Sequence, residues 1–438
     1  MKNLTDAIDY GLSRGCNDIE LYIETSSNLE LEIRAGKLDK YQESKAQGIG
    51  VRVIKDHKQS LVYGTSDDTK DLQKSIDEAI EILEFMDEDD IEIHGDEEFK
   101  GNIESEQIFQ ASYNTKLDYI IEQEKNGIGN AVTKALVEST AYEENKYSKQ
   151  IINSKGLNKT ETGAYCGSSI SLAINQDGVN ETGYAYYYTR DINELFKQDL
   201  GNEANEKARE MLGAGLVNSK KYTAIFSAEV VVDLLRLLSY SFNGENIYKG
   251  KSLFKDKIGL KVISDKLNII DDGNDVKALG FTYFDGDGVM AKRTPIIKDG
   301  VFLGGLYNLS MAKKAGSTTT GNATRSHSSL PNIGYHNLCI LNGDVDVKDM
   351  MIELNQGIIL KELMGLHMAN PITGEFSLGA SGMIIENGKI NGGFRGVTIS
   401  GNILDIFSNI IAVGNDFQRR TTVGAPSLLI QDVIVSGS

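Results

Sequence analysis

Alternating polar and apolar positions dominate the first 65 residues, after one short helix. Apolar residues from Leu4 to Leu12 recur three and four residues apart, which predicts a helix that ends at Gly15. Four alternating segments follow and predict an antiparallel meander, at about 18–26, 28–35, 48–55 and 59–64. Apolar residues at helical spacing from Leu72 to Met86 predict a second helix. This order indicates an α+β unit with its helices on one face of the sheet.

A second unit, from about 110 to 215, has a similar order. Strands are predicted at 135–141, 147–153, 160–175 and 182–188. One helix follows, opened by a capping box of Asp191 and Glu194, and its apolar side extends to Met211. Between the two units the chain is almost wholly acidic from 87 to 98, which is typical of a solvated linker, and a binding tail is the alternative.

After residue 215 the pattern changes to short β-like runs. One clear helix comes first, capped by Ser227 and extending from Glu229 to about Phe242. Asp-Gly and Asn-Gly pairs, which favour tight hairpins, then stand at 272–273, 285–286, 287–288, 299–300, 342–343, 387–388 and 391–392. The sequence therefore predicts an α+β fold in two parts. An N-terminal α+β domain spans 1–215, with units near 1–90 and 110–215, and a large antiparallel β-rich domain spans 216–438.

Composition argues against several classes of protein. The 438 residues include 63 acidic and 45 basic side chains, a formal net charge of -18, so a long basic face for nucleic acid is not expected. Cys16, Cys166 and Cys339 form no CxxC pair or disulfide framework, which fits a reducing compartment. Neither an apolar run of about 18 residues nor a signal peptide is visible. We expect a soluble, cytoplasmic protein.

Two glycine-rich segments look like ligand loops but have the wrong spacing. In 244–252, five residues separate the glycines where a nucleotide loop has four, and the segment follows a helix rather than a strand. The run Asp285-Gly286-Asp287-Gly288 begins like a calcium loop, yet apolar residues occupy the later ligand positions. We expect a hairpin turn with exposed carboxylates there.

The histidines form no metal or nucleophile motif. No two are three or four residues apart, so no HExxH helix exists; they are His57, His94, His327, His336 and His367. Serines at 326, 328 and 329 lie beside His327, but no G-x-S-x-G elbow accompanies them. Surface or structural histidines are expected, and the residues alone reveal no catalytic constellation.

An ordered set of motifs resembles the TldD/PmbA family, once named modulators of DNA gyrase. The set comprises Asn153–Gly156, Phe284–Val289, Arg293–Thr294, Ile297–Phe302, Thr320–Arg325, Glu362–Gly365, Asn370–Ser377 and Ile385–Gly388. The resemblance spans nearly the whole chain. Because the segments occur in the right order, the set is far more specific than any one piece.

Within that family, the TldD branch carries an HExxxH zinc motif before a segment like 252–259. The six matching positions here, 235–240, read L-R-L-L-S-Y, and the tail 414–427 lacks the branch's late cysteine ligand. Leucine has no lone pair for a metal, and arginine does not act as a general base. The chain therefore resembles the PmbA branch, also called TldE. The resemblance implies no catalytic residue, metal or cofactor in this chain, with zinc in a TldD-like partner.

The resemblance also implies a function in cytosolic proteolysis. In the family picture, two subunits enclose a chamber in which unfolded or leader peptides are cleaved. Three hypotheses follow: a non-catalytic, substrate-holding subunit, a peptidase in its own right, or a non-enzymatic regulator of DNA gyrase. The net charge speaks against direct DNA contact in the third. We expect a dimer, homomeric when the partner is absent.

The peptide is expected to lie against charged and glycine-rich turns of the C-terminal domain. These substrate-binding candidates are Asp285, Asp287, Arg293, Gly321, Asn322 and Arg325. Arginine binds a carboxylate bidentately, and glycine permits close approach of the backbone to a ligand. The alternative is that Asp285, Asp287 and Arg325 brace hairpins through local ion pairs.

Overall fold

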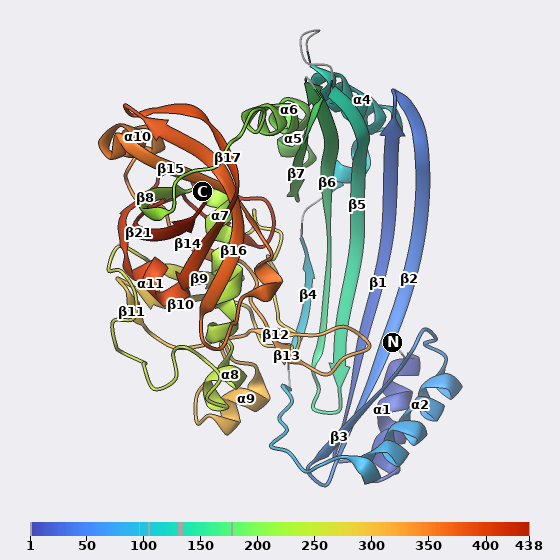
Figure 1. Cartoon of the computed structure of the whole chain (residues 1–438). Helices are drawn as coiled ribbons and strands as arrows, with labels where there is room; N and C mark the ends of the chain where they lie inside the picture. The colour runs from blue at the N-terminus through green and yellow to red at the C-terminus, as the bar shows by residue number, and fades with distance from the viewer. Residues whose placement is uncertain (1, 96, 104–105, 130–134, 177, 438) are drawn as a thin grey trace.

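A computed structural model shows two bodies, one built from each half of the chain (Figure 1). It describes every residue except 1, 96, 104–105, 130–134, 177 and 438. The first body is a long sheet, antiparallel except where β4 pairs with β6, with helices on one face. The second body is rich in β structure around a central helix. The predicted α+β class is confirmed.

The first half forms one continuous seven-stranded sheet. Its strands run in the order β3-β2-β1-β5-β6-β4, and β7 also pairs with β6. They are β1 (Asp18–Arg34), β2 (Lys37–Lys55), β3 (Lys58–Gly64), β4 (Glu98–Asn102), β5 (Ala135–Asn153), β6 (Asn158–Gln176) and β7 (Val179–Thr189). Strand β1 pairs with β5 from Glu20 opposite Asn153 onward, so the two predicted units share one sheet.

In two places, a pair of short strands predicted from the sequence is one long strand in the structure. The predicted segment 18–26 and all but the last residue of 28–35 lie in β1, and 135–141 and 147–153 both lie in β5. The alternation of apolar residues is interrupted by a polar stretch around Ser26. The strand continues there because β2 and β5 pair with it on both sides.

The helices lie on one face of the sheet, as predicted, and they cover its two ends. They are α1 (Lys2–Ser13), α2 (Thr69–Ile82), η1 (Leu83–Phe85), α3 (Glu106–Gln110), α4 (Tyr113–Ile128), α5 (Ile192–Leu195) and α6 (Leu200–Glu210). Strand β1 presents Ile19 and Leu21 to the core beside α1 and α2, and Leu31 and Ile33 to the core beside α4. The prediction of one continuous helix after Asp191 is wrong, because the structure has two helices there, α5 and α6. Asp199 caps a new helix there, accepting a hydrogen bond from the Asn202 amide.

The second half forms two six-stranded sheets. One has the order β17-β16-β15-β8-β21-β18 and the other β11-β10-β9-β14-β20-β19. Their strands, with the small pair β12–β13, are β8 (Lys220–Phe226), β9 (Ile269–Asp272), β10 (Arg293–Lys298), β11 (Val301–Phe302), β12 (Ala323–Thr324), β13 (Asn332–Ile333), β14 (Leu338–Ile340), β15 (Gln356–Met364), β16 (Glu375–Glu386), β17 (Lys389–Asn402), β18 (Ile410–Val413), β19 (Gln418–Arg419), β20 (Val423–Ala425) and β21 (Leu428–Ser436). Pairing is mostly antiparallel, as predicted, but β8–β15 and β14–β20 are parallel.

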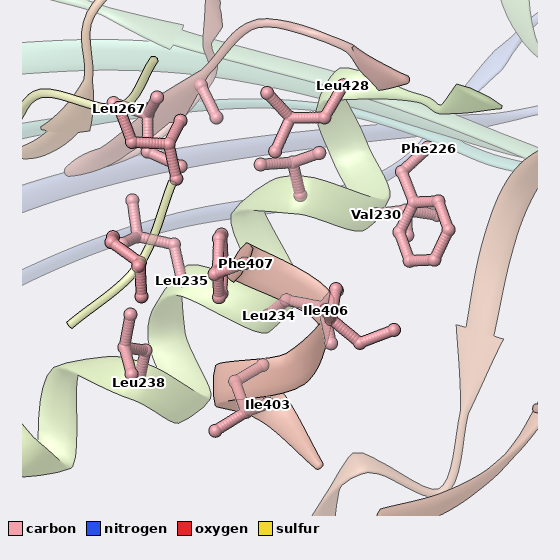
Figure 2. Close-up of a cluster of buried hydrophobic side chains, with 14 of the residues drawn as sticks. Phe226, Val230, Leu234, Leu235, Leu238, Leu267, Ile403, Ile406, Phe407 and Leu428 are labelled. Carbon is pink, nitrogen blue, oxygen red and sulfur yellow. The ribbon is translucent and has the colours of Figure 1, made fainter. Parts of the chain in front are cut away.

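Helix α7 (Ala228–Ser239) is the centre of this body. Ser227 caps it, as predicted, and η2 (Tyr240–Phe242) extends it. Figure 2 shows Leu234, Leu235 and Leu238 packed among side chains from other elements, including Phe407. The remaining helices are α8 (Gly244–Tyr248), α9 (Leu309–Lys314), α10 (Val347–Leu354), η3 (Leu366–Met368) and α11 (Ile403–Ser408).

Local turn chemistry is confirmed where the sequence signal is strongest. Asn387 and Gly388 have φ of 53° and 70° and join β16 to β17 in a hairpin, and Asp299 and Gly300 do the same between β10 and β11. The acidic segment 87–98 is less solvated than expected. Asp89 pairs with Lys314 of α9, and Ile93 is buried. No helix among the described residues is long and apolar enough to cross a membrane.

Candidate functional site

The Asp285–Gly288 turn lies where the two bodies meet. The expectation of exposed carboxylates is wrong, because Asp285 and Asp287 are both buried. Asp285 accepts hydrogen bonds of 2.9 Å from the backbone amides of Asp287, Val289 and Ala323. Asp287 accepts one of 2.9 Å from the amide of Leu309. These amides satisfy the carboxylates within the protein, as bracing residues require.

Both carboxyl groups titrate far above the ordinary range. Burial raises the pKa of Asp285 to about 7, and the nearby charge of Asp287 acts in the same direction. Burial also raises the pKa of Asp287, to about 6, although the charge of Arg52 opposes the shift. The raised pKa values of Asp285 and Asp287 therefore lie close to neutral pH.

Arg325 connects this turn region to the first sheet. Its side chain has 0% exposure, and Nη1 lies 2.6 Å from Oε1 of Glu20 on β1. Arg52 donates to the same oxygen at 3.2 Å, and the Arg325 guanidinium lies 4.6 Å from the Tyr22 ring centroid. Burial opposes ionisation of Glu20, but the charges of Arg325 and Arg52 outweigh it and lower the Glu20 pKa. In this arrangement Arg325 is enclosed rather than presented to a ligand.

Of the other three predicted substrate-binding residues, two lie in this buried region and one lies on the surface. Asn322 is buried and donates from Nδ2 to Oδ2 of Asp271 at 2.6 Å. Gly321, at φ +71°, accepts a hydrogen bond at its carbonyl from Nε2 of His336 at 2.7 Å. Arg293 is half exposed on β10, with Nε 3.7 Å from Asp272. The structure thus gathers Asp285, Asp287, Gly321, Asn322 and Arg325 on buried segments and leaves Arg293 outside.

The loop after Arg325 crosses the first sheet. Glu24 accepts from the backbone amide of His327 at 2.8 Å and lies 3.0 Å from its Nδ1. Gly48 leaves room for the imidazole, because a Cβ at that position would lie 2.3 Å from the ring. The Ser326 hydroxyl instead contacts the neighbouring serine hydroxyls. His327 therefore has a structural position, as expected.

The positions that match the zinc motif lie on the end of α7 and on Tyr240, the first residue of η2. Leu235 is fully buried in the core, whereas Arg236 is partly exposed. Arg236 donates from Nη1 to Asp233 at 3.1 Å and from Nη2 to the Thr421 hydroxyl at 3.0 Å. Thr421 belongs to the tail 414–427, where the late cysteine would be. The fold therefore brings the two substituted segments together, and a guanidinium joins them.

Charged residues around this part of α7 link it to the first body. Arg420 lies 2.8 Å from Glu203 of α6, and Lys207 of α6 lies 2.8 Å from Glu229 of α7. Burial raises the pKa of Asp233, which Arg236 partly offsets. Among the residues that the structure describes, no three His, Cys, Asp or Glu side chains converge as metal ligands.

A tyrosine row on β7 was missed by the sequence reasoning. Tyr184, Tyr186 and Tyr188 lie on one face of the strand, with ring centroids 5.5 Å and 6.3 Å apart. Arg420 donates to the Tyr186 carbonyl at 3.1 Å and lies 6.0 Å from its ring centroid. The run Y-A-Y-Y-Y at 184–188 was the available signal, since alternate residues of a strand share a face.

Comparison with known proteins places this architecture among the metallopeptidases. Three family models match in order: PmbA/TldA metallopeptidase domain 1 at 19–83, the central domain at 106–212 and the C-terminal domain at 219–437. The chain belongs to the PmbA/TldD family, and its motifs place it in the PmbA/TldE-like branch.

Individual relatives agree with this assignment. A metalloprotease PmbA homologue of Buchnera aphidicola is 26% identical, covering 98% of this chain and 95% of its own. The metalloprotease PmbA of Escherichia coli O157:H7 is 30% identical over 62% of this chain and 60% of its own.

Solved structures share the fold. TldE of Thermococcus kodakarensis has a TM-score of 0.89 at 21% identity, covering 99% of this chain and all of its own. A Thermotoga maritima protein described as a candidate modulator of a DNA gyrase has a TM-score of 0.88 at 24% identity, covering 99% of each chain.

Proposed function

We propose that this chain is the non-catalytic, substrate-holding subunit of a two-subunit metalloprotease that cleaves unfolded or leader peptides. The observation that supports this most is the composition of α7 and the adjoining η2. Leu235, Arg236 and Tyr240 stand at the zinc-motif positions, and Leu235 lies in the core. Its side chain has no metal-ligating atom, and exchanging it for a ligand would place a polar group among Leu234, Leu238 and Phe407.

In this proposal the zinc belongs to a TldD-like partner, where it would act as a Lewis acid on the scissile carbonyl. The present chain supplies a wall of the chamber and binding contacts along the peptide. Asp285, Asp287, Asn322 and Arg325 stabilise that wall from inside, while the half-exposed Arg293 is accessible to a peptide carboxylate. Two homologous subunits would close such a chamber with pseudo-twofold symmetry.

The proposed location is the cytoplasm. Cys16, Cys166 and Cys339 are free and buried. Burial raises the pKa of Cys166 to about 12 and that of Cys339 to about 11, so neither is readily ionised at neutral pH. Unpaired thiols of this kind are compatible with a reducing compartment.

Co-purification tests the proposal. The chain is co-expressed with a homologue that carries HExxxH, and cleavage of an unfolded peptide is measured for each subunit alone and for the mixture. We expect a stable complex, cleavage by the complex and none by this chain alone. Chelator-sensitive cleavage by this chain alone would overturn the proposal.

Assembly gives a second measurement. Obligate subunit interfaces commonly bury about 2,000 Å² or more, so the chain should present a large complementary surface. We expect a homodimer by light scattering when the partner is absent. A 48 kDa monomer at micromolar concentration would count against this part of the proposal.

A further inference from the structure

The tyrosine row on β7 faces away from the helices of the first body. Ala185 is buried in the core beside α6, so its neighbours Tyr184 and Tyr186 point to the opposite sheet face. Figure 1 shows β7 at the sheet margin nearest the second body, and Arg420 of that body contacts Tyr186. Tyr184 keeps 52% of its surface exposed. Tyr186 and Tyr188 are partly buried, so the row is a partly accessible aromatic surface beside Arg420.

Among the described residues, no second strand pairs with the outer backbone edge of β7, although Arg420 occupies the Tyr186 carbonyl on that edge. The one strand partner of β7 in the described part of the chain is β6. The Tyr186 carbonyl accepts from Arg420, so the backbone polar groups of Tyr186 point outward. In an antiparallel ladder, the direction of these groups alternates residue by residue. Tyr184 and Tyr188 therefore also present their N–H and C=O groups at the outer edge.

The surroundings favour positive charge. Arg420 already lies over the Tyr186 ring, which shows that the row accommodates a cation. The Tyr188 hydroxyl donates to Glu143 at 3.4 Å, and Glu203 and Glu229 lie around Arg420. Arg420 and Lys207 already pair with Glu203 and Glu229, so the aromatic faces and Glu143 are the groups that attract an incoming lysine or arginine side chain.

We propose that the β7 edge and its tyrosine row hold an extended peptide that carries lysine or arginine at alternate positions. This inference rests on the proposed substrate-holding function and names the surface and the peptide chemistry. The peptide main chain would add as a strand to β7. Its alternate side chains, about 6.6 Å apart, would then match the spacing of successive rings.

Fluorescence anisotropy with the full chain tests the surface. One probe is a fluorescein-labelled dodecapeptide of alternating lysine and serine, and the other has the same composition with its lysines in one block. Both probes carry the same charge, so a general attraction to the acidic protein affects them alike. We expect the alternating probe to bind about fivefold more tightly, because it aligns a cation with each ring.

Substitutions of the tyrosines test whether the preference for the alternating probe arises from the β7 row. Tyr184→Ala combined with Tyr186→Ala should abolish the preference for the alternating probe, and the corresponding Tyr→Phe pair should keep it because the rings remain. Tyr184→Ala alone should reduce it, and this half-exposed side chain is replaced without disturbing the core. Tyr248→Ala is the matched control, since this tyrosine is 58% exposed on α8 outside the row.

Equal affinity for the two probes, or an unchanged preference in Tyr184→Ala/Tyr186→Ala, would overturn the inference. If the mixture with the zinc-bearing homologue still cleaves peptide, the proposed function stands without this surface. If the preference is found but no complex or cleavage is obtained, the proposed function fails and the surface assignment remains.

Discussion

Arg325 and Glu20 lie 305 residues apart in the sequence and form a wholly buried ion pair of 2.6 Å. The pair joins the second body to strand β1 of the first. Arg52 contacts the same carboxylate oxygen, so two guanidinium groups form ion pairs with the single carboxylate of Glu20. Nε and Nη2 of Arg325 have no hydrogen-bond partner among the described residues, which leaves Glu20 and the Tyr22 ring as its principal contacts.

Arg325→Ala should therefore lower the free energy of unfolding by about 3 kcal/mol. Removing one member of a buried ion pair leaves the other incompletely compensated, although Arg52 remains beside Glu20. Urea denaturation measures the change. Arg293→Ala is the control, and it should cost less than about 0.5 kcal/mol because Arg293 is half exposed. Unchanged stability, together with lost cleavage in the reconstituted complex, would show that Arg325 binds peptide instead.

This pair also shows what the sequence could and could not predict. The segment Thr320–Arg325 is recognisable as a motif, but nothing in its neighbourhood indicates Glu20 as the partner. The helix from Ser227 was predictable because its cap and apolar spacing are local signals. The burial of Asp285 was not, since it depends on amides such as that of Ala323, which the chain supplies 38 residues later.

Asp285 should make stability depend on pH. Its folded pKa of about 7 lies above the value of about 3.9 for an unfolded aspartate, so the folded state binds more protons between these values. Its contribution is present below pH 4 and is lost as the pH rises through 7. From pH 5 to pH 8 we expect a loss of about 3 kcal/mol from this group. Urea titrations across this range measure it.

Asp285→Asn isolates the pH effect from the local hydrogen bonds. The amide lowers stability at every pH, because its NH₂ group replaces an oxygen that accepts from a backbone amide. The slope between pH 5 and 8 should nevertheless become flatter, and the exposed control Asp344→Asn should leave it unchanged. The same slope in Asp285→Asn as in the parent would contradict the assignment.

Gly48→Ala should destabilise the contact between the 326–329 loop and β2. An added Cβ would lie 2.3 Å from the His327 ring, so the ring and its contact with Glu24 would have to shift. Overpacking of this kind costs about 1–3 kcal/mol. Thermal unfolding measures it, with Gly64→Ala as control because nothing lies within 4 Å of the Cβ added there. Equal melting temperatures for the two variants would contradict the packing argument.

The isolated chain should hold no stoichiometric zinc. After dialysis against metal-free buffer, elemental analysis should find well below one zinc per chain, because Leu235, Arg236 and Tyr240 offer no pair of imidazoles. One zinc per chain in the parent protein would overturn the assignment of the metal to a partner.

A variant that restores the HExxxH motif tests the prediction about zinc more strictly. The triple variant Leu235→His/Arg236→Glu/Tyr240→His should still fail to bind zinc tightly, since the tail 414–427 has no cysteine to complete the set. It should also unfold more easily than the double variant Arg236→Glu/Tyr240→His, because the Leu235→His substitution buries an imidazole in the α7 core. Urea denaturation of the two variants measures this difference. Equal stability of the two would show that position 235 tolerates a polar side chain, and the burial of Leu235 would then not explain the missing ligand.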